Sequence, residues 1–164
     1  MTIAYWLLLA VALQRLAELI YSNRNTKRLV SEGGSEVGKG HYSIIVAVHV
    51  GWLVTMTLAN PPDTNVIWPL VALYGAVQLL RIWVLVSLGR YWSTRVIDLP
   101  DAPLVRHGPY RWCKHPNYVV VVLEVAILPL AFQLWAVAAI FTFLNSAILA
   151  KRIHVENQVL RHRG

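Results

Sequence analysis

Charged residues are scarce in this chain, at 14% of its 164 residues, whereas soluble domains carry about 25%. This shortage argues against an ordinary soluble domain, whose surface needs more charge. Hydrophobic residues reach 57% and come in runs long enough to cross a bilayer, which takes roughly 20 residues each. The sequence therefore predicts an all-α integral membrane protein in which residues 1–164 form a single membrane domain.

Cysteine and the common cofactor motifs are also nearly absent. Cys113 is the only cysteine, which excludes an intrachain disulfide and a cysteine-based metal site. The six histidines show no metal-ligand spacing, so we expect no metal. The glycine-containing segment 32–40 follows no strand pattern, and we interpret it as a flexible loop and not as a phosphate-binding loop. The sequence also lacks a G-x-S-x-G nucleophile motif.

The apolar runs predict five transmembrane helices, three in residues 1–88 and two in residues 89–164. The last run is too long for one upright helix, and it suits a tight helical hairpin that turns near residues 129–135. The predicted spans are Ile3–Tyr21, Tyr42–Ala59, Val66–Leu88 and a hairpin over Tyr118–Ile148.

Lysine and arginine residues gather in three segments: residues 22–41, residues 89–116 and the C-terminal tail. With five spans, all three segments fall on one side of the membrane. Basic loops stay in the cytoplasm, so we expect the N-terminus outside, and the C-terminus and the active site inside. The net charge of +7 then reflects topology and attraction to anionic lipid headgroups, and not binding of nucleic acid.

Several polar residues fall inside the predicted spans, where each is costly unless it has a partner. Arg15 and Glu18 are three residues apart, so they share a helix face and can pair with each other. Arg81 lies near the end of its span and is expected to extend its charge to the interface. Glu124 needs a cation, which we expect from the basic loop before it or from the tail. Asn145 suits a hydrogen bond between helices.

The segment GPYRWCKHPNY, residues 108–118, interrupts the apolar runs with prolines, cations and aromatic rings. Pro116 is expected to be the first residue of a helix, where its missing N–H costs nothing, and His115 its N-cap. The backbone N–H groups of residues 117–119 are then expected to be free and to attract an anion such as a carboxylate. The plainer alternative is a stiff interfacial loop with an aromatic belt.

This segment, the hydrophobic hairpin and the following RIHVEN together resemble the isoprenylcysteine carboxyl methyltransferase family, whose members are integral membrane enzymes. The resemblance covers roughly residues 85–160. This chain has Asn157 and Val119 where the family usually has glutamate and glycine. The family pattern is G-x-Y-x-x-x-x-H-P-x-Y followed by R-x-x-x-E, which here is Gly108, Tyr110, His115, Pro116, Tyr118, Arg152 and Glu156.

The resemblance implies S-adenosylmethionine as the cofactor, in a cytoplasmic pocket formed by the loop before the fourth helix and the C-terminal tail. It implies a catalytic and substrate-binding role for Arg152, and Glu124 and Asn145 are further candidates for contact with the substrate. Arg152 and Glu156 are four residues apart, so they share a helix face. The expected cofactor-binding residues are Leu104, Val105, Tyr110, His115, Pro116, Asn117, Tyr118 and Glu156.

The expected reaction is methyl transfer to an ionised oxygen of a lipophilic or lipidated acceptor, because a carboxylate needs no general base at neutral pH. Prenylcysteine and the acidic hydroxyl of a lipid-like polyketide, such as an alkylpyrone, remain open as acceptors. A phospholipid amine N-methyltransferase is an alternative, but Arg152 beside a neutral amine would be counterproductive. A small membrane carrier or assembly protein without enzymatic activity is a further alternative, and the oligomeric state is open.

Overall fold

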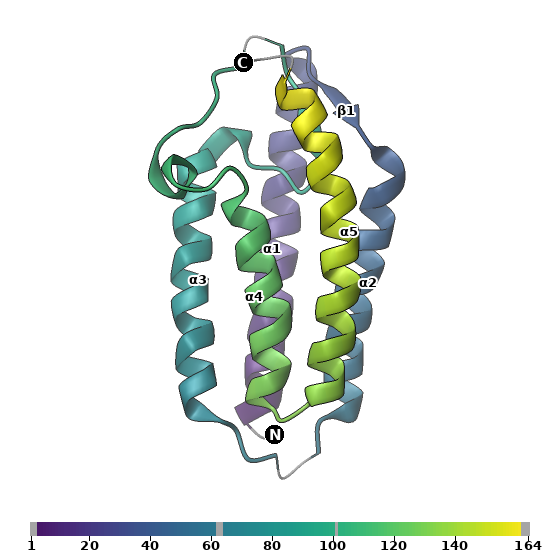
Figure 1. Cartoon of the computed structure of the whole chain (residues 1–164), viewed down its shortest axis with the longest axis vertical. Helices are drawn as coiled ribbons and strands as arrows, with labels where there is room; N and C mark the ends of the chain where they lie inside the picture. The colour runs from purple at the N-terminus through teal and green to yellow at the C-terminus, as the bar shows by residue number, and fades with distance from the viewer. Residues whose placement is uncertain (1–2, 62–63, 101, 162–164) are drawn as a thin grey trace.

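The computed structural model describes residues 3–61, 64–100 and 102–161. Five α-helices run side by side along the long axis of the molecule, and most of the non-helical chain lies at one end (Figure 1). The elements in chain order are α1 (Ile3–Ser31), β1 (Ser35–Val37), α2 (Lys39–Ala59), α3 (Trp68–Leu88), η1 (Gly89–Tyr91), β2 (Val96–Asp98), η2 (Gly108–Arg111), α4 (Pro116–Ala131) and α5 (Trp135–Arg161).

Four of these helices are long and apolar enough to cross a membrane, and the fifth is shorter. The candidate spans are Ile3–Ser31, Tyr42–Ala59, Trp68–Tyr91 and Trp135–Gln158. Helix α4 has 16 residues, which corresponds to roughly 24 Å at 1.5 Å per residue, less than the roughly 30 Å of a bilayer core. The structure therefore supports an all-α membrane protein. Of the five predicted membrane-spanning helices, four are long enough to cross the bilayer.

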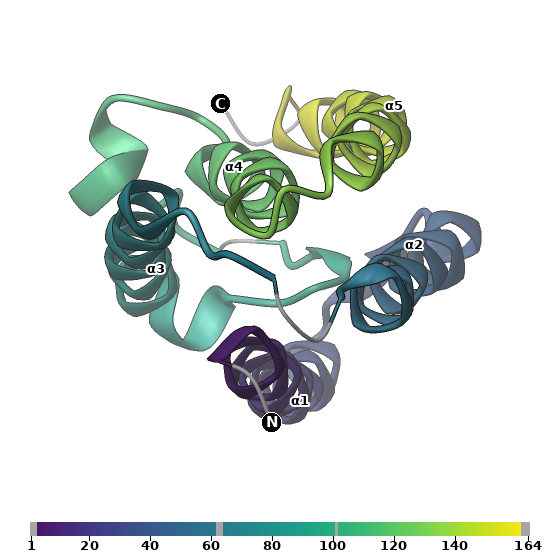
Figure 2. The ribbon, with the colours of Figure 1, turned by 90° about the horizontal axis from the view of Figure 1, so that it is seen from below.

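The helices surround a common core, and the end-on view shows their order (Figure 2). Helix α4 lies between α3 and α5, and α1 lies across the bundle from α4. Fully buried side chains of α2 and α4, such as Trp52, Met56 and Val120, fill the interior. Large apolar side chains point outward, among them Leu58, Val86 and Phe143, each more than 70% exposed. Such an outer surface suits a lipid environment and not water.

Helices α4 and α5 form the expected hairpin, which turns at Phe132–Leu134. Gln133 takes a positive φ of 61°, and the Phe132 and Leu134 N–H groups both donate to the Pro129 carbonyl, at 3.1 and 2.8 Å. The hairpin differs from expectation in its second arm, because α5 continues to Arg161. Between Trp135 and Arg161 the sequence has no glycine or proline that would end the helix. The predicted tail is therefore a helical extension that holds Arg152 and Glu156.

A two-stranded antiparallel sheet joins two segments at the loop end of the bundle. Strand β1 pairs with β2, with Glu36 opposite Ile97. Arg95 adds an ion pair to Glu36 at 2.8 Å. The interpretation of residues 32–40 as a flexible loop was therefore wrong for β1. Its partner strand is about sixty residues away in the sequence, so no local pattern indicates the pairing.

Candidate functional site

A cavity of about 210 Å³ lies at the loop end of the bundle, and we call it the loop cavity. Its walls come from the segment between η1 and α4, from the first turn of α4 and from the extension of α5. Most of the cofactor-binding residues expected from the sequence meet here. These are Leu104, Val105, Tyr110, His115, Asn117, Tyr118 and Glu156.

Glycine and proline shape the segment that delivers Tyr110 to this cavity. Gly108 has φ 59°, and a Cβ there would lie 2.1 Å from the Ser87 Oγ, so only glycine fits. Pro109 is the second residue of the short helix η2 and is buried. Burial raises the pKa of the Tyr110 phenol well above its usual range, and the negative charge of Glu156 raises it further. Tyr110 is therefore a neutral wall of the cavity at physiological pH.

Helix α4 begins as expected, with His115 as N-cap and Pro116 as its first residue. However, fewer backbone N–H groups are free at this helix start than we predicted. The Tyr118 and Val119 N–H groups both donate to the His115 carbonyl, at 3.1 and 3.5 Å. The reason is that the N-cap carbonyl already accepts the first bonds of a helix, one of them in the tighter 3₁₀ geometry. Of the three groups predicted to be free, two are used.

The Tyr118 hydroxyl connects the two charged residues of the R-x-x-x-E motif. It accepts a hydrogen bond from the Arg152 Nε at 2.8 Å and donates a short one to the Glu156 carboxylate. His115 stacks on the Tyr118 ring with centroids 5.4 Å apart. Asn157 stands where the resembling family usually has glutamate, and its Oδ1 lies 3.0 Å from the His115 Nε2. The motif residues of α4 and α5 thus form one connected group.

A second cavity, of about 150 Å³, is lined by residues of all five helices, and we call it the helix cavity. Its surface is mainly apolar, with side chains such as Val46, Leu53 and Val121. Arg15 and His49 also line it, so that the cavity has polar groups at helix depth. Four side chains line both cavities, and we call them the wall residues: Trp92, Asn117, Tyr118 and Arg152.

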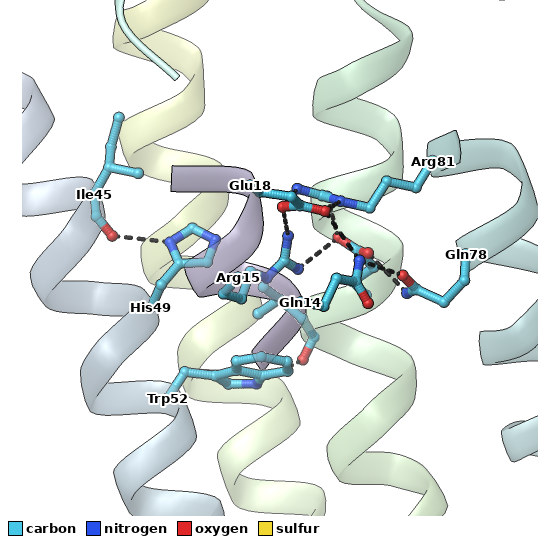
Figure 3. A network of polar contacts seen from close by, with 10 residues as sticks. Gln14, Arg15, Glu18, Ile45, His49, Trp52, Gln78 and Arg81 are labelled. Atoms are coloured by element: carbon cyan, nitrogen blue, oxygen red, sulfur yellow. Dashed lines mark hydrogen bonds and ion pairs between the residues drawn. The ribbon is translucent and has the colours of Figure 1, made fainter. Parts of the chain in front are cut away.

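A buried ion network lies beside the helix cavity, and Figure 3 shows Gln14, Arg15 and Glu18 of α1 facing Gln78 and Arg81 of α3. The expected pair forms, with 3.2 Å between the Arg15 Nη1 and Glu18 Oε2, but Arg15 also binds a carboxylate of α4 at 2.8 Å. Arg81 is 5% exposed and pairs with Glu18. The prediction that Arg81 extends to the interface was therefore wrong.

Glu124 is the α4 carboxylate of this network and is fully buried. It accepts bonds from Arg15, from Arg81 at 2.7 Å and from the Gln78 amide at 2.8 Å. The prediction of a partner from the basic loop or the tail was wrong. Cations of α1 and α3 lie at the same depth as the carboxylates, and pairing them there avoids the cost of an isolated buried charge.

Three residues that we expected at the site line neither cavity in the described part of the chain. Pro116 is buried at the start of α4 and lines neither cavity. Glu124 belongs to the ion network. Asn145 is 2% exposed, and its Nδ2 has no hydrogen-bond partner within the described ranges, so the structure does not show the expected interhelical bond.

Sequence reasoning missed Trp92, which lines both cavities. It also missed the side of the helix cavity formed by Arg15 and His49. The only sequence feature that pointed to Arg15 was the energetic cost of a charged side chain inside a membrane span. Trp92 gave no signal, because one aromatic residue at the end of a predicted span normally indicates an interfacial belt.

Comparison with known proteins identifies a family and two uncharacterized relatives. The family model described as isoprenylcysteine carboxyl methyltransferase matches residues 70–162. An uncharacterized protein of Bacillus subtilis, YpbQ, is 35% identical over 162 residues, which cover 96% of each chain. An uncharacterized protein of Haemophilus influenzae is 24% identical over 155 residues, 90% of this chain and 89% of the relative. No solved structure matches the chain.

Proposed function

The chain belongs to the isoprenylcysteine carboxyl methyltransferase family, and from this premise we propose that it transfers a methyl group from S-adenosylmethionine to an ionised oxygen of a lipophilic acceptor. One observation carries the proposal: the wall residues Asn117, Tyr118 and Arg152 line both the loop cavity and the helix cavity. A methyl donor in the first cavity and a lipophilic acceptor in the second would meet at this wall.

Several groups that line the loop cavity could bind parts of S-adenosylmethionine. The Asn117 Oδ1 is buried and has no hydrogen-bond partner in the described part of the chain. It and the Glu156 carboxylate can accept hydrogen bonds from an ammonium group or from ribose hydroxyls. Leu104, Val105 and Tyr110 offer surfaces for an adenine ring. The residues present therefore fit this cofactor.

When bound, the cofactor supplies a methyl group on a positively charged sulfur. The residues of the chain position the acceptor and need not move a proton, since a carboxylic acid with a pKa near 4 is already ionised at neutral pH. Tyr118 uses the Arg152 Nε–H, so an anionic acceptor would bind the terminal nitrogens of the guanidinium. The apolar lining of the helix cavity would exclude water, and catalysis would consist mainly of alignment.

The charges around the helix cavity argue against an amine acceptor. Arg15 and Arg81 line it together with Glu18, and the carboxylates of the ion network balance them, which leaves Arg152 as the cation available to an acceptor. Cations favour an anionic reacting group and disfavour a product that becomes positively charged after methylation. We therefore rank O-methylation above N-methylation of a phospholipid headgroup.

Access to the two cavities would come from different phases. The loop cavity lies at the end of the bundle that holds the basic loops, away from the N-terminus (Figure 1). We propose that this end faces the cytoplasm, because basic loops stay there. The cofactor would then enter from the cytosol and the lipophilic acceptor from the bilayer.

The proposal is tested in two steps with purified protein in detergent. Calorimetry measures binding of S-adenosylhomocysteine, the product form of the cofactor, and micromolar or tighter binding is expected. Methyl-labelled S-adenosylmethionine is then added with a membrane lipid extract of the source organism and with N-acetyl-S-farnesylcysteine, and labelled products are identified. Folded protein that binds no S-adenosylhomocysteine would refute the proposal. Label found only on amines would refute O-methylation.

A further inference from the structure

Trp92 has a buried hydrogen-bond donor that the protein itself does not use. The residue is 2% exposed, and its Nε1 has no hydrogen-bond partner among the described residues. It is also a wall residue, which lines both the loop cavity and the helix cavity. A buried indole N–H usually finds a partner, and leaving it unpaired is costly.

Contacts that do not involve this N–H hold Trp92 in place. Its backbone N–H donates to the Gly89 carbonyl at 3.1 Å. Its own carbonyl accepts a bond from the Asn25 side chain at 2.8 Å. Its ring stacks on Tyr21 at 5.6 Å between centroids, with 13° between the planes. The indole is therefore fixed before any ligand binds, which is the condition for a donor that positions a reacting group.

Trp52, the other fully buried tryptophan, shows the ordinary arrangement. It is 0% exposed, and its Nε1 donates to the Val125 carbonyl at 3.2 Å. It lines neither cavity. Both tryptophans are buried, but only Trp92, which lines the two cavities, has an unpaired N–H. Burial alone therefore does not explain the unpaired donor.

We propose that the Trp92 Nε1–H donates a hydrogen bond to the reacting, ionised oxygen of the acceptor. This inference rests on the proposed function. Arg152 is a second hydrogen-bond donor among the wall residues, and an anionic oxygen such as a carboxylate or an ionised hydroxyl can accept hydrogen bonds from two donors. Trp92 is then a specificity-determining residue, which favours acceptors whose reacting atom has free oxygen lone pairs.

The first test compares Trp92→Phe with Trp52→Phe in the absence of ligands. Both variants lose a similar buried ring area, but only Trp52→Phe breaks a hydrogen bond. Because that hydrogen bond stabilises the folded protein, the melting temperature of Trp52→Phe should fall further than that of Trp92→Phe by about 2–4 °C. An equal fall would mean that the Trp92 N–H is already paired in the free protein, and the inference would be overturned.

The second test measures transfer from methyl-labelled S-adenosylmethionine to N-acetyl-S-farnesylcysteine and to the membrane lipid extract. Trp92→Phe should lower kcat/KM for the acceptor about 10- to 100-fold, the range for a lost hydrogen bond to a charged group, and leave S-adenosylhomocysteine affinity unchanged. Trp52→Phe should keep both. Normal transfer by Trp92→Phe, or loss of S-adenosylhomocysteine binding, would overturn this inference alone. A wild-type protein that methylates none of these acceptors would overturn the proposed function, and this inference with it.

Discussion

Replacing Glu124 with glutamine should destabilise the protein more than any surface charge change. Glu124 is fully buried and binds Arg15 at 2.8 Å and Arg81 at 2.7 Å. With Glu18, the network holds two arginines and two carboxylates, so its charges balance. Glu124→Gln keeps the shape but leaves one buried positive charge without a partner. Breaking a buried pair in this way costs about 3–5 kcal/mol.

The assay is reversible unfolding in mixed detergent micelles, followed by circular dichroism. The matched control is Glu32→Gln. It breaks an ion pair between partly exposed side chains, in which the Glu32 Oε2 lies 2.6 Å from the Arg90 Nη2. Exposed pairs contribute about 0–1 kcal/mol, so the control should unfold almost as the wild type does. If Glu124→Gln also costs less than about 1 kcal/mol, the network is not a balanced set of buried charges.

A double variant, Glu124→Gln with Arg15→Gln, separates charge balance from lost hydrogen bonds. It removes one charge of each sign, so the remaining Arg81 and Glu18 can still pair. The double variant should therefore be more stable than the sum of the two single losses implies, by about 1–3 kcal/mol. Simple additivity would show that each side chain contributes alone, and the argument from net charge would fail.

Three further predictions concern the site and the topology. Glu156→Gln should weaken S-adenosylhomocysteine binding by about 1.5–3 kcal/mol, whereas Arg152→Lys should mainly lower turnover, because lysine lacks the planar fork; equal loss of cofactor affinity would refute this division of roles. Gly108→Ala should lower the melting temperature and weaken S-adenosylhomocysteine binding, whereas Gly33→Ala, where a Cβ meets nothing within 4 Å, should preserve binding. A C-terminal tag should be accessible only from the cytoplasm and an N-terminal tag only from outside, and protease protection showing both on one side would refute the proposed topology.

The helices were predictable because the bilayer imposes a length on apolar runs. The hairpin turn was predicted near residues 129–135 and lies at Phe132–Leu134, with Pro129 accepting its hydrogen bonds. Helix ends were less predictable, since a helix need not end at the membrane surface. Helix α5 therefore continues past the predicted limit of Ile148.

Site residues were predictable where they are close in sequence or share a motif. His115 is the N-cap of α4 and Tyr118 lies in its first turn, and Arg152 and Glu156 share one face of α5 by their spacing. Partners from distant segments were not predictable, because nothing local encodes them. Arg15 and Glu124 are 109 residues apart, and neither indicates its partner.

The extension of α5 makes Arg152 and Glu156 a single unit with α4. Spacing of four residues puts both side chains on one face, and the hairpin sets that face against the start of α4, where the Tyr118 hydroxyl bonds to both. Glu156 lines only the loop cavity, whereas Arg152 lines both cavities. The hydroxyl between them therefore links the side proposed for the cofactor to the side proposed for the acceptor. A shift in either charged group changes the hydrogen bonding of the other, which gives the proposed enzyme a physical route by which cofactor binding can prepare the acceptor side.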